Sequence, residues 1–223
     1  HTLEVWVHFG GTSEEVWETL DGIIRSFRND AVVRFSTVPT AMWALLRETL
    51  FPEHTVLIVD IGGEFSEVTF FVDGVMRETL TLPYGVFNIL LRISEVEHVD
   101  MENALGMLKG LTSGVLSAET KERLHGILKK EMQNWEEIFE RVWQYAVREM
   151  FTSLHVFFVG GGALLEEMKN AVVPPLLHSE LARGLNVSSI SPDAFQDKFG
   201  TYCCFEGPGD FGLLALVLTH TKL

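Results

Sequence analysis

Stretches in which apolar residues alternate with polar ones, or follow one another without a break, predict β-strands. Val56 to Val59 is an unbroken apolar run with three β-branched residues, which is typical of a strand buried on both faces. Asp73-Gly74, between two later runs, is the two-residue signal of a type I′ hairpin. Strands are predicted at residues 3–9, 31–36, 55–60, 67–72, 75–82, 156–159 and 185–190.

Apolar residues at helical spacing predict helices between and after these strands. A capping box, Thr12 with Glu15, opens the first helix. Residues 86–152 carry no strand pattern and are predicted to be helical, with N-caps at Asp100 and Ser117. Further helices are predicted from Pro39 to residue 50, over 163–171 before Pro174-Pro175, and over 211–220.

The order of these elements predicts an α/β protein. From residue 55 the order is β-β-β-α-β-α-β-α, which is the order of a ribonuclease-H-like unit, and residues 1–52 have the order of the last four elements of the same unit. We therefore expect two tandem units: residues 1–52 as the truncated end of the first, and 53–223 as a complete second with the helical segment 86–152 inserted. Because the chain begins at His1 without Met, we expect a fragment.

Two glycine-rich turns carry the candidate chemistry. The first follows a buried strand as Asp60-Ile61-Gly62-Gly63, and the second is Gly160–Gly162 after the apolar run that ends at Val159. Glycine lets backbone N–H groups approach a ligand closely, so such a turn can cradle a phosphate, and Asp60 can hold Mg²⁺ or a water beside it. The alternative is a tight turn that serves the fold alone.

Charge and cysteine content narrow the classes of function. Asp and Glu number 31 against 17 Lys and Arg, for a formal net charge of −14. Because a nucleic-acid-binding face needs clustered positive charge, no nucleic-acid partner is expected. The adjacent Cys203 and Cys204 fit a reducing compartment better than a disulfide. No apolar run approaches the roughly 20 residues of a membrane span, so we predict a cytoplasmic chain without a transmembrane segment.

The glycine turns and their flanks resemble the actin-like ATPases. Val56–Gly63 is similar to their second phosphate loop, and Val159–Ala163 is similar to their adenosine motif. Within this superfamily the resemblance is to the bacterial division protein FtsA and the type IV pilus protein PilM. It extends to the segments Phe35–Leu46, Leu82–Val86 and Gly209–Leu214, and so covers nearly the whole chain.

The resemblance implies a site for ATP with Mg²⁺. Asp60 would position the metal or the attacking water, as the catalytic and metal-binding residue. Gly62 and Gly63 would contact phosphates, with Ser66 as the nearest hydroxyl, and Lys109 would contact the nucleotide from the helical region. The turn formed by Gly160, Gly161 and Gly162 would line the base and ribose.

The chain departs from the family pattern at three positions. Glu64 and Phe65 stand where the family usually has a small residue followed by Thr, and a carboxylate in a phosphate cradle repels phosphate unless a metal intervenes. Gly106 stands where the acid of the family's Glu-x-x-Lys contact would be. We therefore expect nucleotide binding to be weakened or lost and hydrolysis to be negligible.

The function implied is that of an assembly scaffold. Proteins of this kind assemble in the cytoplasm, peripherally at the inner membrane, with protein partners of a division, pilus or secretion assembly and with copies of themselves. One alternative is a sugar- or acetate-kinase-like phosphotransferase on the same fold, which needs an acceptor pocket between two complete halves. Another is a nuclease with carboxylates around two metals, drawn from Asp60, Glu64, Glu67 and Asp210. The acidic surface and the second glycine turn argue against a nuclease.

Overall fold

A computed structural model provides the three-dimensional structure of the chain. It describes residues 11–33, 35–47, 55–148, 154–177, 185–190, 192–195, 205 and 207–221. The predicted strand at residues 3–9 and the cysteine pair Cys203-Cys204 lie outside the described residues.

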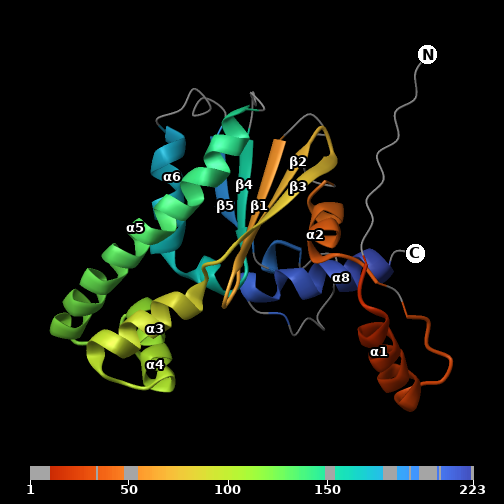
Figure 1. Ribbon diagram of the computed structural model, residues 1–223, viewed down its shortest axis with the longest axis horizontal. Helices are drawn as coiled ribbons and strands as arrows, with labels where there is room; N and C mark the ends of the chain where they lie inside the picture. Colours follow the sequence, from red (N-terminus) through yellow and green to blue (C-terminus); the bar gives the residue numbers. More distant parts are fainter. Residues whose placement is uncertain are drawn as a thin grey trace.

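Five strands within the described ranges form one mixed sheet in the order β3-β2-β1-β4-β5 (Figure 1). β1 pairs antiparallel with β2 and parallel with β4; β2 and β3 are antiparallel, and β4 and β5 are parallel. This arrangement confirms the ribonuclease-H-like α/β unit predicted from residue 55 onward. The strands are β1 Thr55–Ile61, β2 Ser66–Val72, β3 Val75–Leu82, β4 Leu154–Val159 and β5 Leu185–Ser189.

Helices cover both faces of the sheet, with α5 and α6 on one side and α2 and α8 on the other (Figure 1). The helices α3, α4 and the first part of α5 form a helical subdomain that extends beyond one end of the sheet. The helices are α1 Glu14–Phe27, α2 Val38–Leu46, α3 Val86–Glu97, α4 Met101–Ser113, α5 Ala118–Arg148, α6 Glu166–Leu177 and α8 Phe211–Thr221. Short 3₁₀ turns are η1 Gly161–Leu164, η3 Pro192–Phe195 and η5 Pro208–Asp210.

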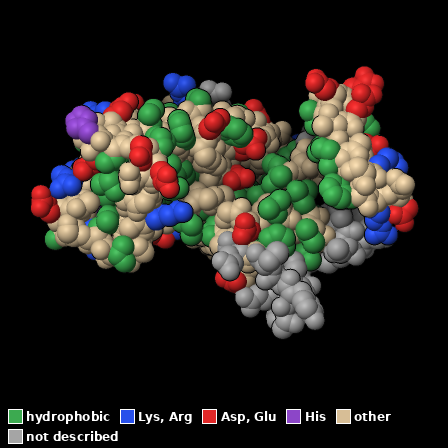
Figure 2. All heavy atoms as spheres, turned by 90° about the horizontal axis from the view of Figure 1, so that it is seen from below, with side chains coloured by type: hydrophobic (Ala, Val, Ile, Leu, Met, Phe, Trp, Pro, Cys, Tyr) green, Lys and Arg blue, Asp and Glu red, His purple; other side chains and the backbone are tan. Residues whose placement is uncertain are grey.

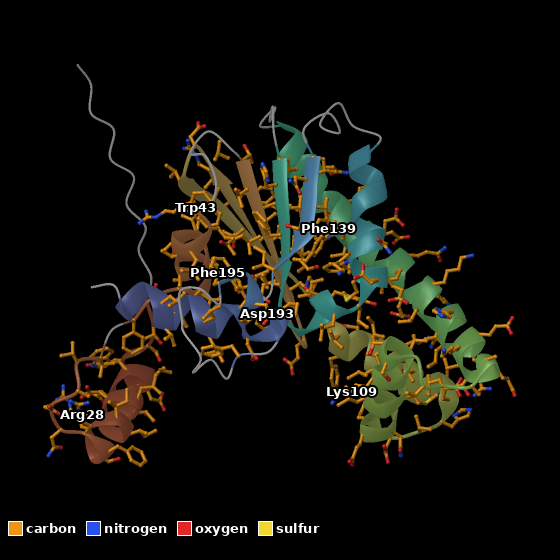
Figure 3. All side chains as sticks on the ribbon, turned by 180° about the vertical axis from the view of Figure 1, so that it is seen from behind. Arg28, Trp43, Lys109, Phe139, Asp193 and Phe195 are labelled. Carbon is orange, nitrogen blue, oxygen red and sulfur yellow. The ribbon has the colours of Figure 1, made fainter. Side chains whose placement is uncertain are left out.

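The central strand β1 is buried on both faces, as its unbroken apolar run predicts. Leu57 and Val59 belong to the core under α5 and α6, whereas Val56 and Ile58 belong to the core under α2 and α8. Side chains of a strand point alternately to its two faces, so one strand supplies both cores. In Figure 3, Trp43 and Phe139 mark these two cores on opposite sides of the sheet.

The local signals of the sequence are confirmed in most places. Asp73 and Gly74 both have positive φ, 50° and 76°, as a type I′ hairpin requires. The side chain of Asp100 accepts a hydrogen bond from the Asn103 amide at 2.8 Å and caps α4, and Ser117 caps α5 in the same way. At α1 the N-cap is Ser13 rather than the predicted Thr12.

One predicted element is wrong, and the ends of another differ from the prediction. The described part of 31–36 forms no strand and pairs with none of the five described strands. There Phe35 packs against Trp17 of α1, with ring centroids 4.7 Å apart. The helix predicted over 163–171 begins instead at Glu166 and continues through Pro174-Pro175. Proline keeps a helical φ, although it lacks an N–H donor and crowds the carbonyl four residues earlier; both prolines lie within the last four residues of α6.

Helix α2 packs on the sheet of the unit that follows it. The indole Nε1 of Trp43 donates to the Gly74 carbonyl at 3.1 Å, and its ring stacks on Phe71 with centroids 4.7 Å apart. On its other side α2 packs closely against α8 at Gly212. Helix α2 falls within the predicted unit 1–52, but it shares its core with strands of 53–223. The division into units stays a prediction.

Gly212 is expected to be required for the close approach of α2 and α8. A Cβ at this position would lie 2.9 Å from Val38 Cγ1 and 3.3 Å from Met42 Cε. We expect Gly212→Leu to lower the free energy of unfolding by about 1–3 kcal/mol through overpacking. Gly126→Leu on α5 is the matched control, since a Cβ added at Gly126 would meet no atom within 4 Å; it should be neutral or stabilising. Equal urea midpoints for the two variants would contradict this packing.

Candidate functional site

The two glycine turns lie side by side at one edge of the sheet. β1 and β4 are parallel neighbours in which Asp60 is paired with Val159, so both strands end at the same level. A Cβ on Gly160 would collide with the carboxyl group of Asp60 and the carbonyl of Ile61, and Gly160 has φ +84°. The second turn therefore needs glycine for both its close approach and its backbone conformation. In open α/β sheets this edge, beyond the carboxyl ends of the strands, is where ligands bind.

A third turn joins these two from the start of α8. The amide of Gly160 donates to the Pro208 carbonyl at 3.0 Å, and a Cβ on Gly209 would lie 3.6 Å from the backbone of Gly161. Gly207, which precedes this turn, also has positive φ, 73°. The segment Gly209–Leu214 of the predicted family resemblance thus begins beside the second glycine turn.

The first glycine turn is fixed by the N-terminus of α3. The amide of Val86 donates to the Gly62 carbonyl at 3.1 Å, and the amide of Phe87 donates to the Gly63 carbonyl at 2.7 Å. The amide of Gly62 donates within the turn, to the Phe65 carbonyl at 3.1 Å. The N–H groups that this turn can offer to an anion are therefore those of the exposed residues 63–65, at its solvent-facing tip.

Asp60 is a partly buried carboxylate beside a second one. Burial raises the pKa of Asp60, and the negative charge of Glu67, its register partner on β2, raises this pKa further. Among the described residues, no group of three or more His, Cys, Asp or Glu side chains is gathered as a metal site. A pair of carboxylates fits Mg²⁺, which in proteins takes one or two carboxylates and completes its shell with water and phosphate oxygens.

The other two predicted contacts are a buried residue at the start of β2 and an exposed residue of the helical subdomain. Ser66 is fully buried, and its hydroxyl donates to the Tyr84 carbonyl at 2.8 Å. This hydroxyl bonds β2 to the segment before α3. Lys109 is exposed on α4 in the helical subdomain (Figure 3). The roles of both residues toward a nucleotide stay predictions.

A cavity of about 250 Å³ lies where the second glycine turn meets the helical subdomain. Leu164 forms one wall beside Glu166 and Glu167, and the Glu167 carboxylate lies 3.9 Å from His125 Nδ1 on α5. The remaining lining residues are Leu111, Thr112 and Lys121. This cavity could not be predicted from the sequence, because its walls come from segments far apart in the chain. The signal that the sequence offers is the polar pair Lys121 and His125 at i, i+4 spacing on α5.

The sheet order, the inserted helical subdomain and the paired turns define the actin-like ATPase fold, and comparison with known structures confirms it. No protein-family model and no curated protein sequence matches the chain. PilM of a PilM–PilN type IV pilus biogenesis complex superposes with a TM-score of 0.60 at 17% identity, over 91% of this chain and 58% of PilM.

Two further solved structures superpose in the same way. A non-polymerisable mutant of pCBH ParM gives a TM-score of 0.56 at 13% identity, over 94% of this chain and 65% of that one. MreB 5 of Spiroplasma citri bound to AMPPNP gives 0.55 at 15% identity, over 95% of this chain and 67% of that one. The chain therefore spans about three fifths to two thirds of the length of these neighbours.

The close approach of the two turns predicts unequal effects of alanine at neighbouring glycines. Gly160→Ala must place a Cβ against Asp60 at positive φ, so it should lower the free energy of unfolding by roughly 2 kcal/mol or more. Gly161→Ala meets no atom within 4 Å and should change it by less than about 0.5 kcal/mol. Urea unfolding of both variants checks this, and similar midpoints would show that the turns are not in contact.

The raised pKa of Asp60 predicts a pH-dependent loss of stability. The folded state holds this proton more tightly than the unfolded state, so stability falls as pH rises from about 3.8 through the folded pKa. Asp60→Asn should therefore be more stable than the wild type at pH 7, by a margin that shrinks toward pH 4. Urea unfolding across this range measures the margin, with Glu64→Gln in the exposed turn as control. A stability difference between Asp60→Asn and the wild type that does not change with pH would contradict the raised pKa of Asp60.

Proposed function

We propose that the chain is the nucleotide-binding part of a PilM-like, actin-fold assembly scaffold. The observation that supports this is the juxtaposition of Asp60 and the two glycine turns at the carboxyl ends of β1 and β4. This edge offers carboxylates for a cation and backbone amides for an anion within a fold whose neighbours include an AMPPNP-bound protein. The scaffold acts in the cytoplasm, peripherally at the inner membrane, in pilus or secretion assembly or in division.

Each side of the proposed site has a distinct role. Asp60, with Glu67 beside it, would hold Mg²⁺, whose charge would neutralise the phosphates of the nucleotide. The tip of the first turn, with Gly63, supplies exposed amides toward the phosphates. The Gly160–Gly162 turn lines the ribose, and the 250 Å³ cavity beyond it receives the base.

The same geometry supports binding without efficient hydrolysis. Phosphoryl transfer needs positioned charge on every side of the γ-phosphate. The described residues supply one wall of such a site, and exposed Glu64 adds a negative charge at the turn that would face the phosphates. Nucleotide binding in this chain therefore serves to set the conformation of an assembly protein.

An apolar surface supports the scaffold role. Helix α1 has no buried residue, and it exposes Trp17, Ile23 and Phe27, the last of them 87% exposed. Figure 2 shows hydrophobic side chains gathered over α8 and the adjoining side of α1, where Leu213 and Val217 of α8 are also exposed. An apolar surface of this kind marks a protein contact. We assign it to a protein partner of the proposed assembly.

No helix among the described residues has the length and apolar character needed to cross a membrane. Partners are expected to be proteins, as for the PilM neighbour, whose structure is that of a complex with PilN.

Calorimetry with Mg·ATP and a phosphate-release assay test the proposed function. We expect the chain to bind Mg·ATP without measurable turnover, and Asp60→Asn to weaken binding about tenfold through loss of a charged ligand to Mg²⁺. Glu64→Gln should strengthen binding instead, because it removes the repulsive charge. The absence of binding would contradict nucleotide recognition, and turnover that Asp60→Asn abolishes would contradict the inactive site.

A further inference from the structure

Glu131 is a buried carboxylate in the middle of α5 that the proposed site does not use. It is 7% exposed, and its Oε2 accepts hydrogen bonds from the Tyr84 hydroxyl at 2.9 Å and from Asn134 Nδ2 at 3.3 Å. Its backbone carbonyl also accepts from the Tyr84 hydroxyl, at 3.2 Å. A buried carboxylate is unfavourable unless it is fully bonded, so this group fixes the position of α5 against Tyr84. Burial and the neighbouring Glu131 raise the pKa of Tyr84, which keeps its hydroxyl a donor.

Tyr84 is bonded to the first glycine turn through its own backbone and the residues that follow. Its carbonyl accepts from the Ser66 hydroxyl at 2.8 Å, on the strand that leaves this turn. Two residues later α3 begins, and its first amides donate to the carbonyls of Gly62 and Gly63. A Cβ on Gly85, between Tyr84 and α3, would collide with these same carbonyls. A shift of Tyr84 therefore cannot leave the first turn unchanged.

Trp135, one helical turn after Glu131, is linked to the second glycine turn through the start of α6. It is fully buried, and its Nε1 donates to the Met168 carbonyl of α6 at 3.0 Å. The amide of Met168 donates to the Leu165 carbonyl at 3.1 Å, and the amide of Leu165 donates to the Gly162 carbonyl at 2.9 Å. The rings of Tyr84 and Trp135 also contact each other, with centroids 5.6 Å apart.

We propose that Tyr84 and Trp135 are positioning residues that bond both glycine turns to a single turn of α5, residues 131–135. The spacing of the two turns and the position of α5 are then coupled, so a ligand that draws the turns together moves α5 and the helical subdomain attached to it. Arg123 near the start of α5 carries this movement to α3 through its ion pair with Glu97, at 3.0 Å. The ligand-driven part of this coupling rests on the proposed nucleotide site; the coupling between the turns does not.

Amide hydrogen exchange of the ligand-free chain tests the coupling. Tyr84→Phe should speed exchange of the Val86 and Phe87 amides about tenfold, through loss of one hydrogen bond to a buried carboxylate. It should also speed exchange at Leu165 and Met168, on the far side of α5, by about threefold or more. Trp135→Phe should produce the reciprocal pattern. A purely local structural role would leave the distant turn unaffected, and that result would overturn the proposal.

Variants at Trp43 and at Glu131 serve as controls. Trp43→Phe removes a comparable indole bond, to the Gly74 carbonyl on the opposite face of the sheet; it should leave exchange at both turns unchanged. Glu131→Gln keeps an acceptor for the Tyr84 hydroxyl and should retain near wild-type exchange at both turns. Glu131→Ala removes this acceptor and should reproduce the effect of Tyr84→Phe. If Trp135→Phe does not fold, the effect of Tyr84→Phe at Leu165 and Met168 decides the question.

A second arm adds Mg·ATP to the wild-type chain. Slower exchange over residues 130–136 on binding would support transmission to α5, and Tyr84→Phe should reduce this protection. Binding without any change in α5 would overturn the ligand-driven step and leave the proposed function intact. An absence of binding would count against the proposed function, while the exchange of the ligand-free variants would still decide the coupling.

Discussion

The parallel pairing of β1 with β4 is the constraint on which the candidate site depends. Its register sets Asp60 opposite Val159, so the two segments that leave these strands must share one edge. There is no room for side chains between them, which is why Gly160 contacts the Asp60 carboxyl group directly. A shift of one residue in this register would turn Asp60 toward the opposite core and separate the turns. The site is thus a consequence of strand pairing, with the helices holding it from outside.

The two hydrophobic cores support the carboxyl ends of β1 and β4 from opposite faces of the sheet. The core under α2 and α8 fixes the face of the sheet on which Asp60 and Glu67 lie. The core under α5 and α6 contains Trp135, through which the helical subdomain is bonded to the second turn. Because interiors are close-packed, we expect movement at the turns to be passed to whole elements. In the proposed function, such a linkage would change the surface of the protein when its site is filled.

Much of this fold could be predicted from local sequence patterns. The run Val56–Val59, the Asp73-Gly74 hairpin and the N-cap at Asp100 each determine structure through near neighbours, and each prediction is confirmed. Contacts between distant segments could not be predicted in this way. The sequence pattern of residues 31–36 predicts a strand, but it does not reveal that their described part pairs with none of the five described strands. Nor does it reveal that the Ser66 hydroxyl is bonded to Tyr84, or that Glu131 of α5 is buried.

The turns after β1 and β4 are proposed to form one site for Mg·nucleotide. Amide chemical shifts of the isotopically labelled chain, titrated with Mg·AMPPNP, test this most directly. We expect the largest changes in two segments far apart in the sequence, at residues 60–65 and 160–164, saturating together with one dissociation constant. Changes confined to one turn, or to a surface away from the ends of β1 and β4, would contradict the claim.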